Sequence, residues 1–357
     1  MDFSGEKFPT RFWYRDEKEH IVCTLCPRQC HLREGKRGVC YVRQAIDGQI
    51  VLHGGVTSGL CVDPIEKKPL FHFLPGTPVL SFGTQGCNLT CRFCQNWQIS
   101  KSRETDTLNQ PASATDIAQL ARKYHCPSVA FTYNDPVIFM EYALEVSRAC
   151  HLLGIKTVAV TAGYINPEPC VEFYAGMDAA NIDLKGFSER FYHSMCGGHL
   201  LPVLETLRYV YHKTPVWLEL TTLLIPGEND SDEALIAQCE WIGRELGVEV
   251  PLHFTAFHPD FHLLDKPTTS HASLCRARAL ALKVGLKHVY IGNQPDPEGE
   301  NSYCANCGTL LIQRAGYRLV DWHLMMGKCP VCGTACAGIF EPEPGDWGSR
   351  RLRIING

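Results

Sequence analysis

The stretch PVLSFGTQGCNLTCRFCQNW, residues 78–97, joins a candidate strand to a loop that holds three cysteines. The near-continuous apolar character of PVLSFG predicts a strand that is buried on both faces, as in a parallel sheet. The loop then places Cys87, Cys91 and Cys94 within eight residues and supplies no fourth cysteine. Four protein ligands normally complete a cysteine-ligated metal site, so three cysteines leave one position open. The other interpretation is a structural zinc that a distant His or Cys completes.

The strand-then-helix order repeats from about residue 79 to residue 293. Six further apolar runs predict strands at 127–134, 156–163, 179–186, 215–227, 251–259 and 287–293. Between them apolar residues recur at helical spacing, as in 114–124 and 229–246, and we expect Asp230 and Glu233 to cap the second of these helices. This alternation predicts an α/β fold, either a β/α barrel or a doubly wound sheet. Six or seven units fit a partial (β/α)6-type, TIM-like barrel.

Polar or glycine residues follow the predicted strands, at the edge where a β/α barrel forms its active site. Asp183 and Lys185 are two residues apart on one strand, so both are expected to face the same cavity. Four further candidates at strand ends are Asn134, Asp135, Thr161 and His258. His258 has a competing interpretation as a hydrogen-bonded core histidine.

Nineteen cysteines are many for a chain of 357 residues without a secretory signal, and they indicate metal binding more than disulfides. Besides the three-cysteine loop, there are two tight groups. One comprises Cys23, Cys26, Cys30 and Cys40, and the other comprises Cys304, Cys307, Cys329 and Cys332, with Cys336 close behind. The seven remaining cysteines are expected to be small buried apolar residues: Cys61, Cys126, Cys150, Cys170, Cys196, Cys239 and Cys275.

The second of these groups has 21 residues between its two Cys-x2-Cys pairs, which predicts a zinc ribbon. Cys336 is a competing ligand. The first group suits either a second zinc or an auxiliary [4Fe-4S] cluster, with zinc preferred. A zinc ribbon can also serve as a nucleic-acid-binding module. Basic residues are sparse around this one, so nucleic acid is not an expected partner.

Composition excludes several classes of protein. A hydrophobic content of 45% allows a sizeable core, and a net charge of −4 argues against a broad nucleic-acid-binding surface. The sequence contains no run of about 18 apolar residues, which a membrane span would need. Its first residues lack the apolar core of a signal peptide. We therefore expect a cytoplasmic protein with no membrane partner. Three domains are expected: a Cys-rich metal-binding segment at 1–76, the barrel at 77–295, and a zinc-ribbon-like domain at 296–357.

The loop pattern Cys87-x3-Cys91-x2-Cys94, with Phe93 before the last cysteine, resembles the signature of the radical S-adenosylmethionine (SAM) superfamily. Longer segments resemble the AmmeMemoRadiSam-system radical SAM enzymes, relatives of pyruvate formate-lyase activating enzyme. They include IEKKPLFHFLPGTPVLSFGTQGCNLTCRFCQNWQIS at 65–100, DLKGFSERFY at 183–192 and FTAFHPDF at 254–261. The cysteine groups at both ends fall within the resemblance, which therefore covers most of the chain.

The resemblance implies a [4Fe-4S] cluster on the three loop cysteines, whose open iron binds SAM. One electron from the reduced cluster would release methionine and a 5′-deoxyadenosyl radical, which abstracts hydrogen from the substrate. By position, Asn134 and Asp135 would lie near the SAM amino group, Lys185 near its carboxylate beside Asp183, His258 near the ribose and Phe93 near adenine. The implied partners are a reductant such as flavodoxin or ferredoxin and a protein substrate.

Two hypotheses thus remain. The first is a radical SAM enzyme of the oxidoreductase class, similar to the activases of glycyl-radical enzymes. The second is a metal-stabilised module that binds nucleic acid or protein without catalysis. The three-cysteine loop, the Asp-x-Lys pair and the barrel pattern together favour the first.

Overall fold

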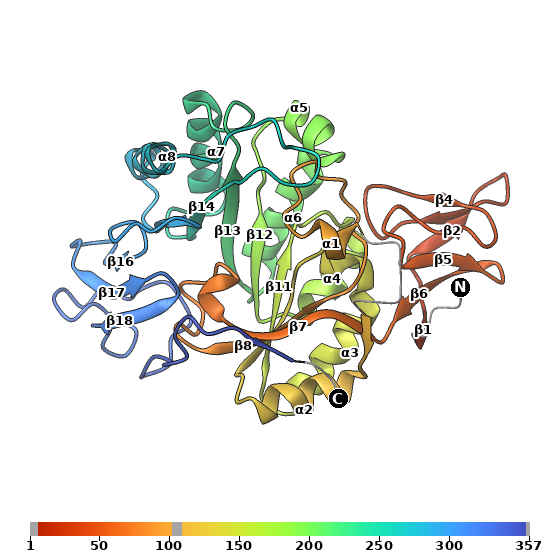
Figure 1. Ribbon diagram of the computed structural model, residues 1–357, viewed down its shortest axis with the longest axis horizontal. Coiled ribbons are helices and arrows are strands. Elements are labelled where there is room, and N and C mark those ends of the chain that lie inside the picture. Colours follow the sequence, from red (N-terminus) through yellow and green to blue (C-terminus); the bar gives the residue numbers. More distant parts are fainter. Residues whose placement is uncertain (1–5, 102–108, 355–357) are drawn as a thin grey trace.

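The computed structural model describes residues 6–101 and 109–354. Its centre is a sheet of ten strands within these residues (Figure 1). Seven of the described strands run parallel, and each pairs with the next one in the series. They are β8 (Pro78–Gly83), β10 (Ser128–Phe131), β11 (Lys156–Thr161), β12 (Ala179–Asp183), β13 (Trp217–Leu224), β14 (Leu252–Ala256) and β15 (Val289–Gly292). Every strand expected from the apolar runs is present.

Helices follow these strands in the alternating order that the sequence predicts. The α-helices of the described residues are α1 (Trp97–Ser100), α2 (Ala114–Lys123), α3 (Met140–His151), α4 (Pro167–Ala175), α5 (Glu189–Phe191), α6 (Leu200–Lys213), α7 (Asp232–Glu245) and α8 (His271–Val284). Shorter turns of helix are η1 (Ile65–Lys67), η2 (Pro136–Phe139) and η3 (Tyr192–Cys196). No hydrogen-bonded pairing between the described residues joins β8 to β15, so the barrel is open. The predicted partial barrel is confirmed, and the doubly wound alternative is excluded because successive strands are neighbours.

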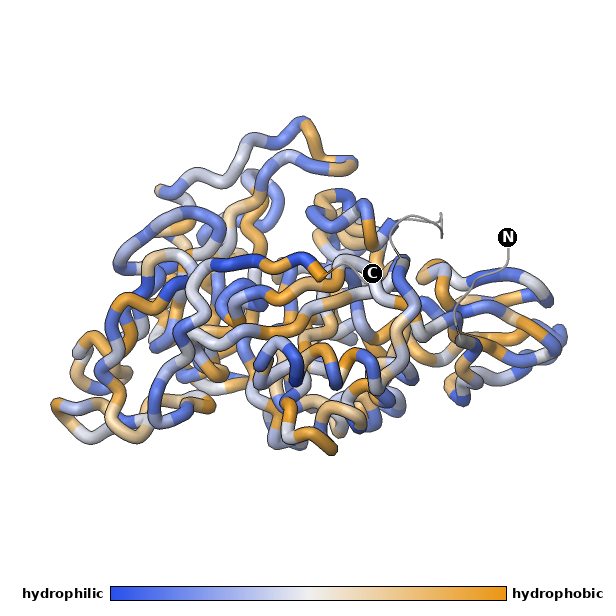
Figure 2. The backbone as a smooth tube through the Cα atoms, turned by 60° about the horizontal axis from the view of Figure 1, so that its bottom comes forward, coloured by the Kyte–Doolittle hydropathy of each residue, from blue (hydrophilic) through white to orange (hydrophobic). Residues whose placement is uncertain are grey.

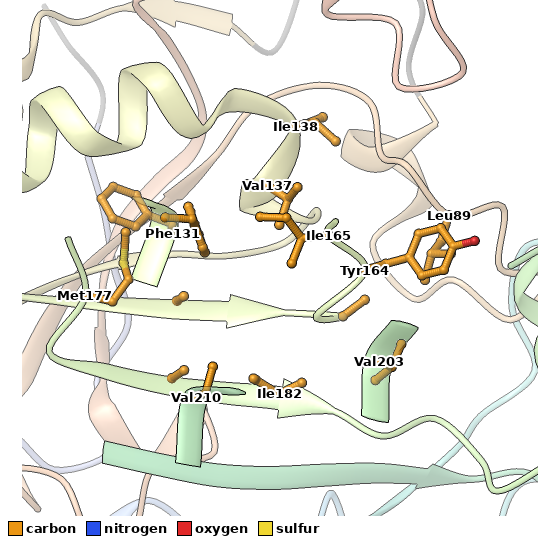
Figure 3. Packing of buried hydrophobic residues seen from close by; sticks show 14 of the residues in the cluster. Leu89, Phe131, Val137, Ile138, Tyr164, Ile165, Met177, Ile182, Val203 and Val210 are labelled. Carbon is orange, nitrogen blue, oxygen red and sulfur yellow. The ribbon is translucent and has the colours of Figure 1, made fainter. Parts of the chain in front are cut away.

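Apolar side chains hold the helices against the sheet. Figure 3 shows Ile182 of β12 together with Val203 and Val210 of α6, and all three are fully buried. Burying a side chain of this size stabilises the fold by about 1.5–3 kcal/mol. Figure 2 shows hydrophobic stretches along the strands in the middle of the molecule, as expected for strands covered on both faces. All helices of the described chain are too short or too polar to span a bilayer.

The cap of α7 differs from the one expected. Ser231, and not Asp230, is the N-cap residue, and its side chain accepts a hydrogen bond from the backbone N–H of Ala234. Asp230 lies one residue earlier and accepts from the backbone N–H of Gly227, at 2.8 Å. Both residue types form caps, and the turn that precedes the helix decides which of them sits at the cap position.

The strand β7 (Val56–Pro64) extends the sheet beyond β8 and runs antiparallel to it. β9 (Asn109–Pro111) and β19 (Leu352–Arg353) pair with β7 in turn. The expected boundary at residue 76 therefore separates β7 from the sheet to which it is hydrogen-bonded. An open barrel leaves the edge of β8 unpaired, and β7 satisfies those backbone groups.

Small antiparallel sheets lie at opposite ends of the molecule (Figure 1). The N-terminal part forms two: β1 (Glu6–Pro9), β5 (Arg43–Ile46) and β6 (Gln49–Gly54) in one, and β2 (Trp13–Arg15), β3 (Ile21–Cys23) and β4 (His31–Leu32) in the other. The C-terminal sheet consists of β16 (Ser302–Tyr303), β17 (Leu310–Ala315) and β18 (Arg318–Trp322). Each cysteine group at the ends of the chain thus belongs to a small sheet region beside the barrel.

A buried polar cluster fills the barrel near the N-terminal ends of its strands. Glu219 of β13 accepts hydrogen bonds from the backbone N–H groups of Phe71 and His72, at 3.0 and 2.8 Å. It also pairs with His253 Nε2 at 2.7 Å and with Trp217 Nε1 at 3.0 Å. These contacts hold the segment after η1 inside the barrel, so the open cavity is left at the other end of the strands.

Candidate active site

A cavity of about 400 Å³ lies at the C-terminal ends of the parallel strands. This size suits a small-molecule site, and this edge is where β/α barrels carry their chemistry. Its lining includes nine residues expected from the sequence: Cys87, Cys91, Phe93, Cys94, Asn134, Asp135, Thr161, Asp183 and Lys185. His258 is exposed and is not part of the described lining.

The three-cysteine loop leaves β8 through a tight turn. Gly86 has φ +86°, and a Cβ at this position would lie 1.9 Å from the carbonyl oxygen of Cys40. Only glycine allows the chain to pass so close to the N-terminal segment. Beyond the turn, Cys94 Sγ contacts Ser100 Oγ at 3.0 Å. The three sulfurs of the loop do not all lie within 4.8 Å of one another, as a shared single metal ion would require.

Asn134 holds this loop in place. Its Oδ1 accepts from the backbone N–H of Thr84 at 3.2 Å, and its Nδ2 donates to Thr84 Oγ1 at 3.1 Å and to the Gly86 carbonyl at 2.9 Å. The amide is therefore occupied by the strand end that precedes the cysteines. Its place in the structure is that of a residue that positions the loop, although the sequence suggests contact with a ligand.

Asp135 presents a free carboxylate oxygen in a buried position. Oδ1 accepts from Thr161 Oγ1 at 2.7 Å and from the backbone N–H of Val137 at 3.2 Å. Oδ2 accepts no hydrogen bond from any described residue. Burial raises the pKa of Asp135 to about 6, and the Thr161 hydroxyl partly opposes the shift. A buried oxygen of this kind is costly unless a ligand supplies a donor.

Lys185 and Asp183 form an ion pair at the edge of the same cavity, with Nζ and Oδ2 2.7 Å apart. Burial lowers the pKa of Lys185, but Asp183 and Cys91 more than offset this effect and hold it well above its usual value. The Lys185 backbone is also fixed, because its N–H donates to Tyr192 Oη at 3.1 Å and its carbonyl accepts from Asn229 Nδ2 at 2.7 Å. A charged ammonium is thus held beside the cysteine loop.

Cys196 lies next to Cys91, a contact that the sequence does not suggest. The backbone N–H of Thr90 donates to the Cys196 carbonyl at 2.9 Å, and Arg92 N–H donates to the Met195 carbonyl at 2.9 Å. A hydrogen bond from the Cys196 thiol lowers the pKa of Cys91 to about 6, against the effect of burial. Cys196 itself is fully buried and does not line the cavity.

A cationic wall, Lys67 and Lys68, lines the cavity with Tyr133 and Tyr317. Lys68 Nζ donates to Asp63 Oδ2 at 2.7 Å, and Lys67 Nζ donates to Asp63 Oδ1 at 3.1 Å. Tyr133 Oη donates to the same carboxylate at 3.1 Å. Sequence patterns did not identify this wall, because Asp63 lies on β7 and Tyr133 follows β10.

The C-terminal cysteine quartet is closed. The sulfurs of Cys304, Cys307, Cys329 and Cys332 all lie within 4.8 Å of one another. The 304–332 and 307–329 sulfur pairs are 3.5 and 3.6 Å apart. Cys336 is outside the quartet, with its sulfur 4.0 Å from His72 Nδ1.

The N-terminal cysteines are arranged differently. Cys23, Cys26, Cys30 and Cys40 line a second, smaller cavity, and Asn88 of the three-cysteine loop also lines it. No three of their sulfurs lie within 4.8 Å of one another.

Comparison with known proteins agrees with this geometry. Residues 82–239 match the radical SAM superfamily. An uncharacterized protein of Methanocaldococcus jannaschii is 40% identical over 325 residues, which are 90% of this chain and 96% of that protein. The pyruvate formate-lyase-activating enzyme of Staphylococcus epidermidis is 24% identical, over 52% of this chain and 78% of its own length.

Among solved structures, a radical SAM methyltransferase from Sphaerobacter thermophilus superposes with a TM-score of 0.49 at 15% identity, covering 86% of this chain and 81% of its own. The loop of three cysteines lies within the matched residues, at the end of the first parallel strand. The chain belongs to the radical SAM superfamily.

Proposed function

We propose that Cys87, Cys91 and Cys94 hold a [4Fe-4S] cluster and that the 400 Å³ cavity binds SAM at the iron left without a protein ligand. The observation that carries the proposal is the meeting of three sulfurs with a buried, unpartnered carboxylate oxygen of Asp135. A zinc or a fully ligated cluster would explain neither the missing fourth ligand nor that oxygen.

The residues around the loop fit the polar groups of SAM. Asp135 Oδ2 is available to accept from an amino group, and Thr161 orients the carboxylate through Oδ1. Lys185 is available to bind a carboxylate, because Asp183 keeps it charged in a partly buried position. Phe93 is buried beside the loop, and its ring lies 6.0 Å from that of Phe191. An apolar surface of this kind suits a nucleobase.

A reduced [4Fe-4S] cluster held by Cys87, Cys91 and Cys94 would supply the one electron that cleaves SAM to methionine and a 5′-deoxyadenosyl radical. The chain's own residues bind, orient and exclude water. Asn134 fixes the entry to the loop, and the Glu219 cluster closes the opposite end of the barrel. Water is thereby kept from the cavity floor, which protects reactive species from side reactions.

The substrate would occupy the rest of the cavity, beside the cationic wall of Lys67 and Lys68. Resemblance to glycyl-radical activases supports a protein substrate and a one-electron reductant such as flavodoxin or ferredoxin. The longer AmmeMemoRadiSam-like segments support that subfamily. We further propose that the closed C-terminal quartet binds zinc, since sulfur separations of 3.5 and 3.6 Å suit one tetrahedral ion.

Anaerobic reconstitution tests the proposal. The full chain, loaded with iron and sulfide and reduced with dithionite, is expected to convert SAM to methionine and 5′-deoxyadenosine. Iron-loaded protein that leaves SAM intact would contradict it. Protein that takes up only zinc would support the alternative of a metal-stabilised binding module.

A further inference from the structure

The N-terminal cysteines form a separate group around one small cavity, which radical SAM chemistry does not itself require. Cys23 ends β3, and its backbone N–H donates to the Cys30 carbonyl at 3.0 Å. Cys26 accepts a backbone hydrogen bond from Gln29 at 3.1 Å, which closes the intervening turn. Cys40 returns from a later turn to the same place. A compact local fold thus brings together four thiols from separate turns.

The two cysteine quartets of the chain provide a direct comparison. Four thiolates on one tetrahedral zinc, with Zn–S of about 2.3 Å, have sulfurs about 3.8 Å apart. The C-terminal quartet meets this condition, with all four sulfurs within 4.8 Å of one another. The N-terminal quartet does not, because no three of its sulfurs satisfy the same limit. In a [4Fe-4S] cluster each thiolate binds a different iron, so the sulfurs stand farther apart.

Space remains between the N-terminal sulfurs. The cavity that they line is small, with a volume of about 20 Å³ against the roughly 10–15 Å³ that one water needs, so the type of its lining and not its size indicates the ligand. Leu25, Leu32 and Ile138 form its apolar part. A water would find few partners there, whereas an iron–sulfur cluster is commonly enclosed by apolar side chains.

Arg43 gives an independent indication of a ligand. It lines this cavity and is 1% exposed. Its Nε donates to the Ile138 carbonyl at 3.0 Å, and its Nη2 pairs with Glu141. Its Nη1 has no acceptor among the described residues. A buried guanidinium N–H without an acceptor is costly, and the sulfur atoms of an anionic cluster would supply one.

We propose that Cys23, Cys26, Cys30 and Cys40 bind a second [4Fe-4S] cluster and not zinc. The region adjoins the three-cysteine loop, because the Cys40 carbonyl abuts Gly86 and Arg28 Nε donates to the Asn88 carbonyl at 2.8 Å. Four thiolates saturate the irons, so this cluster binds no substrate and serves as a carrier of single electrons. The proposal stands whether or not the chain cleaves SAM.

The decisive variant removes the other cluster. The full-length triple variant Cys87→Ala, Cys91→Ala, Cys94→Ala is reconstituted anaerobically with iron and sulfide, and its iron, sulfide and zinc are measured. We expect about four irons and four sulfides per chain to remain, with the visible absorbance and the electron paramagnetic resonance signal of a reduced cluster. Iron-free protein, with or without a second zinc, would overturn the proposal.

A second variant gives the reciprocal measurement. The double variant Cys23→Ala, Cys26→Ala leaves only two of the four thiolates, so it should reduce the iron of the otherwise unchanged chain from about eight to about four per chain, while zinc stays constant. Cys307→Ser is the matched control, since it should remove zinc and leave iron unchanged. Equal iron in the triple variant and the unchanged chain would instead mean that the three-cysteine loop binds no cluster, which contradicts the proposed function and not this inference.

Discussion

At the scale of single residues, the cavity is defined by groups whose hydrogen-bonding capacity the protein leaves partly unused. Asp135 Oδ2 is the clearest case, because it is buried and accepts no bond from a described residue. Lys185 is held charged by Asp183 at 2.7 Å. Burial of such groups reduces stability, so their retention at one cavity indicates a binding role.

Asp135→Asn should weaken SAM binding roughly 10- to 100-fold, because a charge-assisted hydrogen bond of about 1.5–3 kcal/mol is lost. Burial raises the carboxyl pKa to about 6, so the ionised form destabilises the fold at higher pH. The variant should therefore unfold at a higher temperature than the unchanged protein at alkaline pH without SAM. Calorimetry and SAM titration measure both effects. Unchanged SAM affinity would remove Asp135 from the binding site.

Lys185→Ala should weaken SAM binding by a few hundred-fold or more, since it would leave the carboxylate of bound SAM desolvated without its cation, and breaking such a pair from one side costs roughly 3–5 kcal/mol. Lys185→Arg should recover only part of the affinity, because a planar fork replaces a compact ammonium. Lys156→Ala is the matched control, as Lys156 is exposed and pairs with Asp178 at the start of β11. Normal iron content with normal affinity in Lys185→Ala would contradict the assignment.

Cys91→Ala should abolish 5′-deoxyadenosine formation while the barrel stays folded, because two thiolates hold the cluster poorly and the loop lies at a strand end. Cys196→Ala is the control, since Cys196 contacts Cys91 but does not line the cavity. It should keep the iron bound and SAM cleavage active. Loss of iron in Cys196→Ala would make Cys196 a fourth ligand and would leave no open iron.

At the scale of elements, the three cysteine regions differ in how their local turns space the sulfurs. The C-terminal turns bring four sulfurs within 4.8 Å of one another, and a small cluster of apolar residues that includes Leu311 and Ile312 packs beside them. Such a small sheet buries little apolar surface, so the zinc proposed for this quartet would supply much of its local stability.

Cys307→Ser should release one zinc per chain and loosen the C-terminal sheet, while SAM cleavage is largely retained. Hydrogen exchange should become faster in β17 and β18 than in β10 to β12. Metal analysis gives the zinc content. Unchanged zinc together with unchanged exchange would exclude a structural zinc at this quartet.

At the scale of the whole molecule, a buried network couples the barrel to the C-terminal sheet. Arg314 of β17 donates to the Phe71 carbonyl at 2.8 Å, and its guanidinium lies 4.3 Å from the centre of the Phe71 ring. His72 Nδ1 contacts the Ala337 carbonyl at 2.6 Å. Because Glu219 fixes the backbone of Phe71 and His72, the same segment contacts both parts of the chain.

Glu219→Gln should destabilise the chain by about 3–5 kcal/mol, because it leaves buried donors without a matching acceptor. The loss should appear in both the barrel and the C-terminal sheet, which denaturant unfolding followed by hydrogen exchange can resolve. Glu245→Gln is the control, since Glu245 belongs to a solvent-exposed ion pair with Arg208 and should matter little. Equal stability of the two variants would show that the network does not couple the parts.

The sequence by itself determined the features that depend on short-range patterns. The apolar runs located all seven parallel strands, and their alternation with helices predicted the partial barrel. The hydrophobic period and the length of a strand are local properties, so they can be recognised in the sequence without knowledge of the fold. The spacing of the cysteines likewise identified three candidate metal regions. Six of the seven scattered cysteines are buried, as expected: Cys61, Cys126, Cys150, Cys170, Cys196 and Cys239.

Only the tertiary structure decided which groups meet. It engaged Asn134 with the loop, left His258 exposed, set Cys196 beside Cys91, and joined β7 to the sheet. Some of these contacts join residues that lie far apart in the chain, and others depend on the direction of a single side chain. A periodic sequence pattern contains information on neither. The distances between the sulfurs of the N-terminal quartet also depend on the tertiary structure. Separate turns bring these sulfurs together, so the spacing of the cysteines along the chain does not determine how far apart they lie.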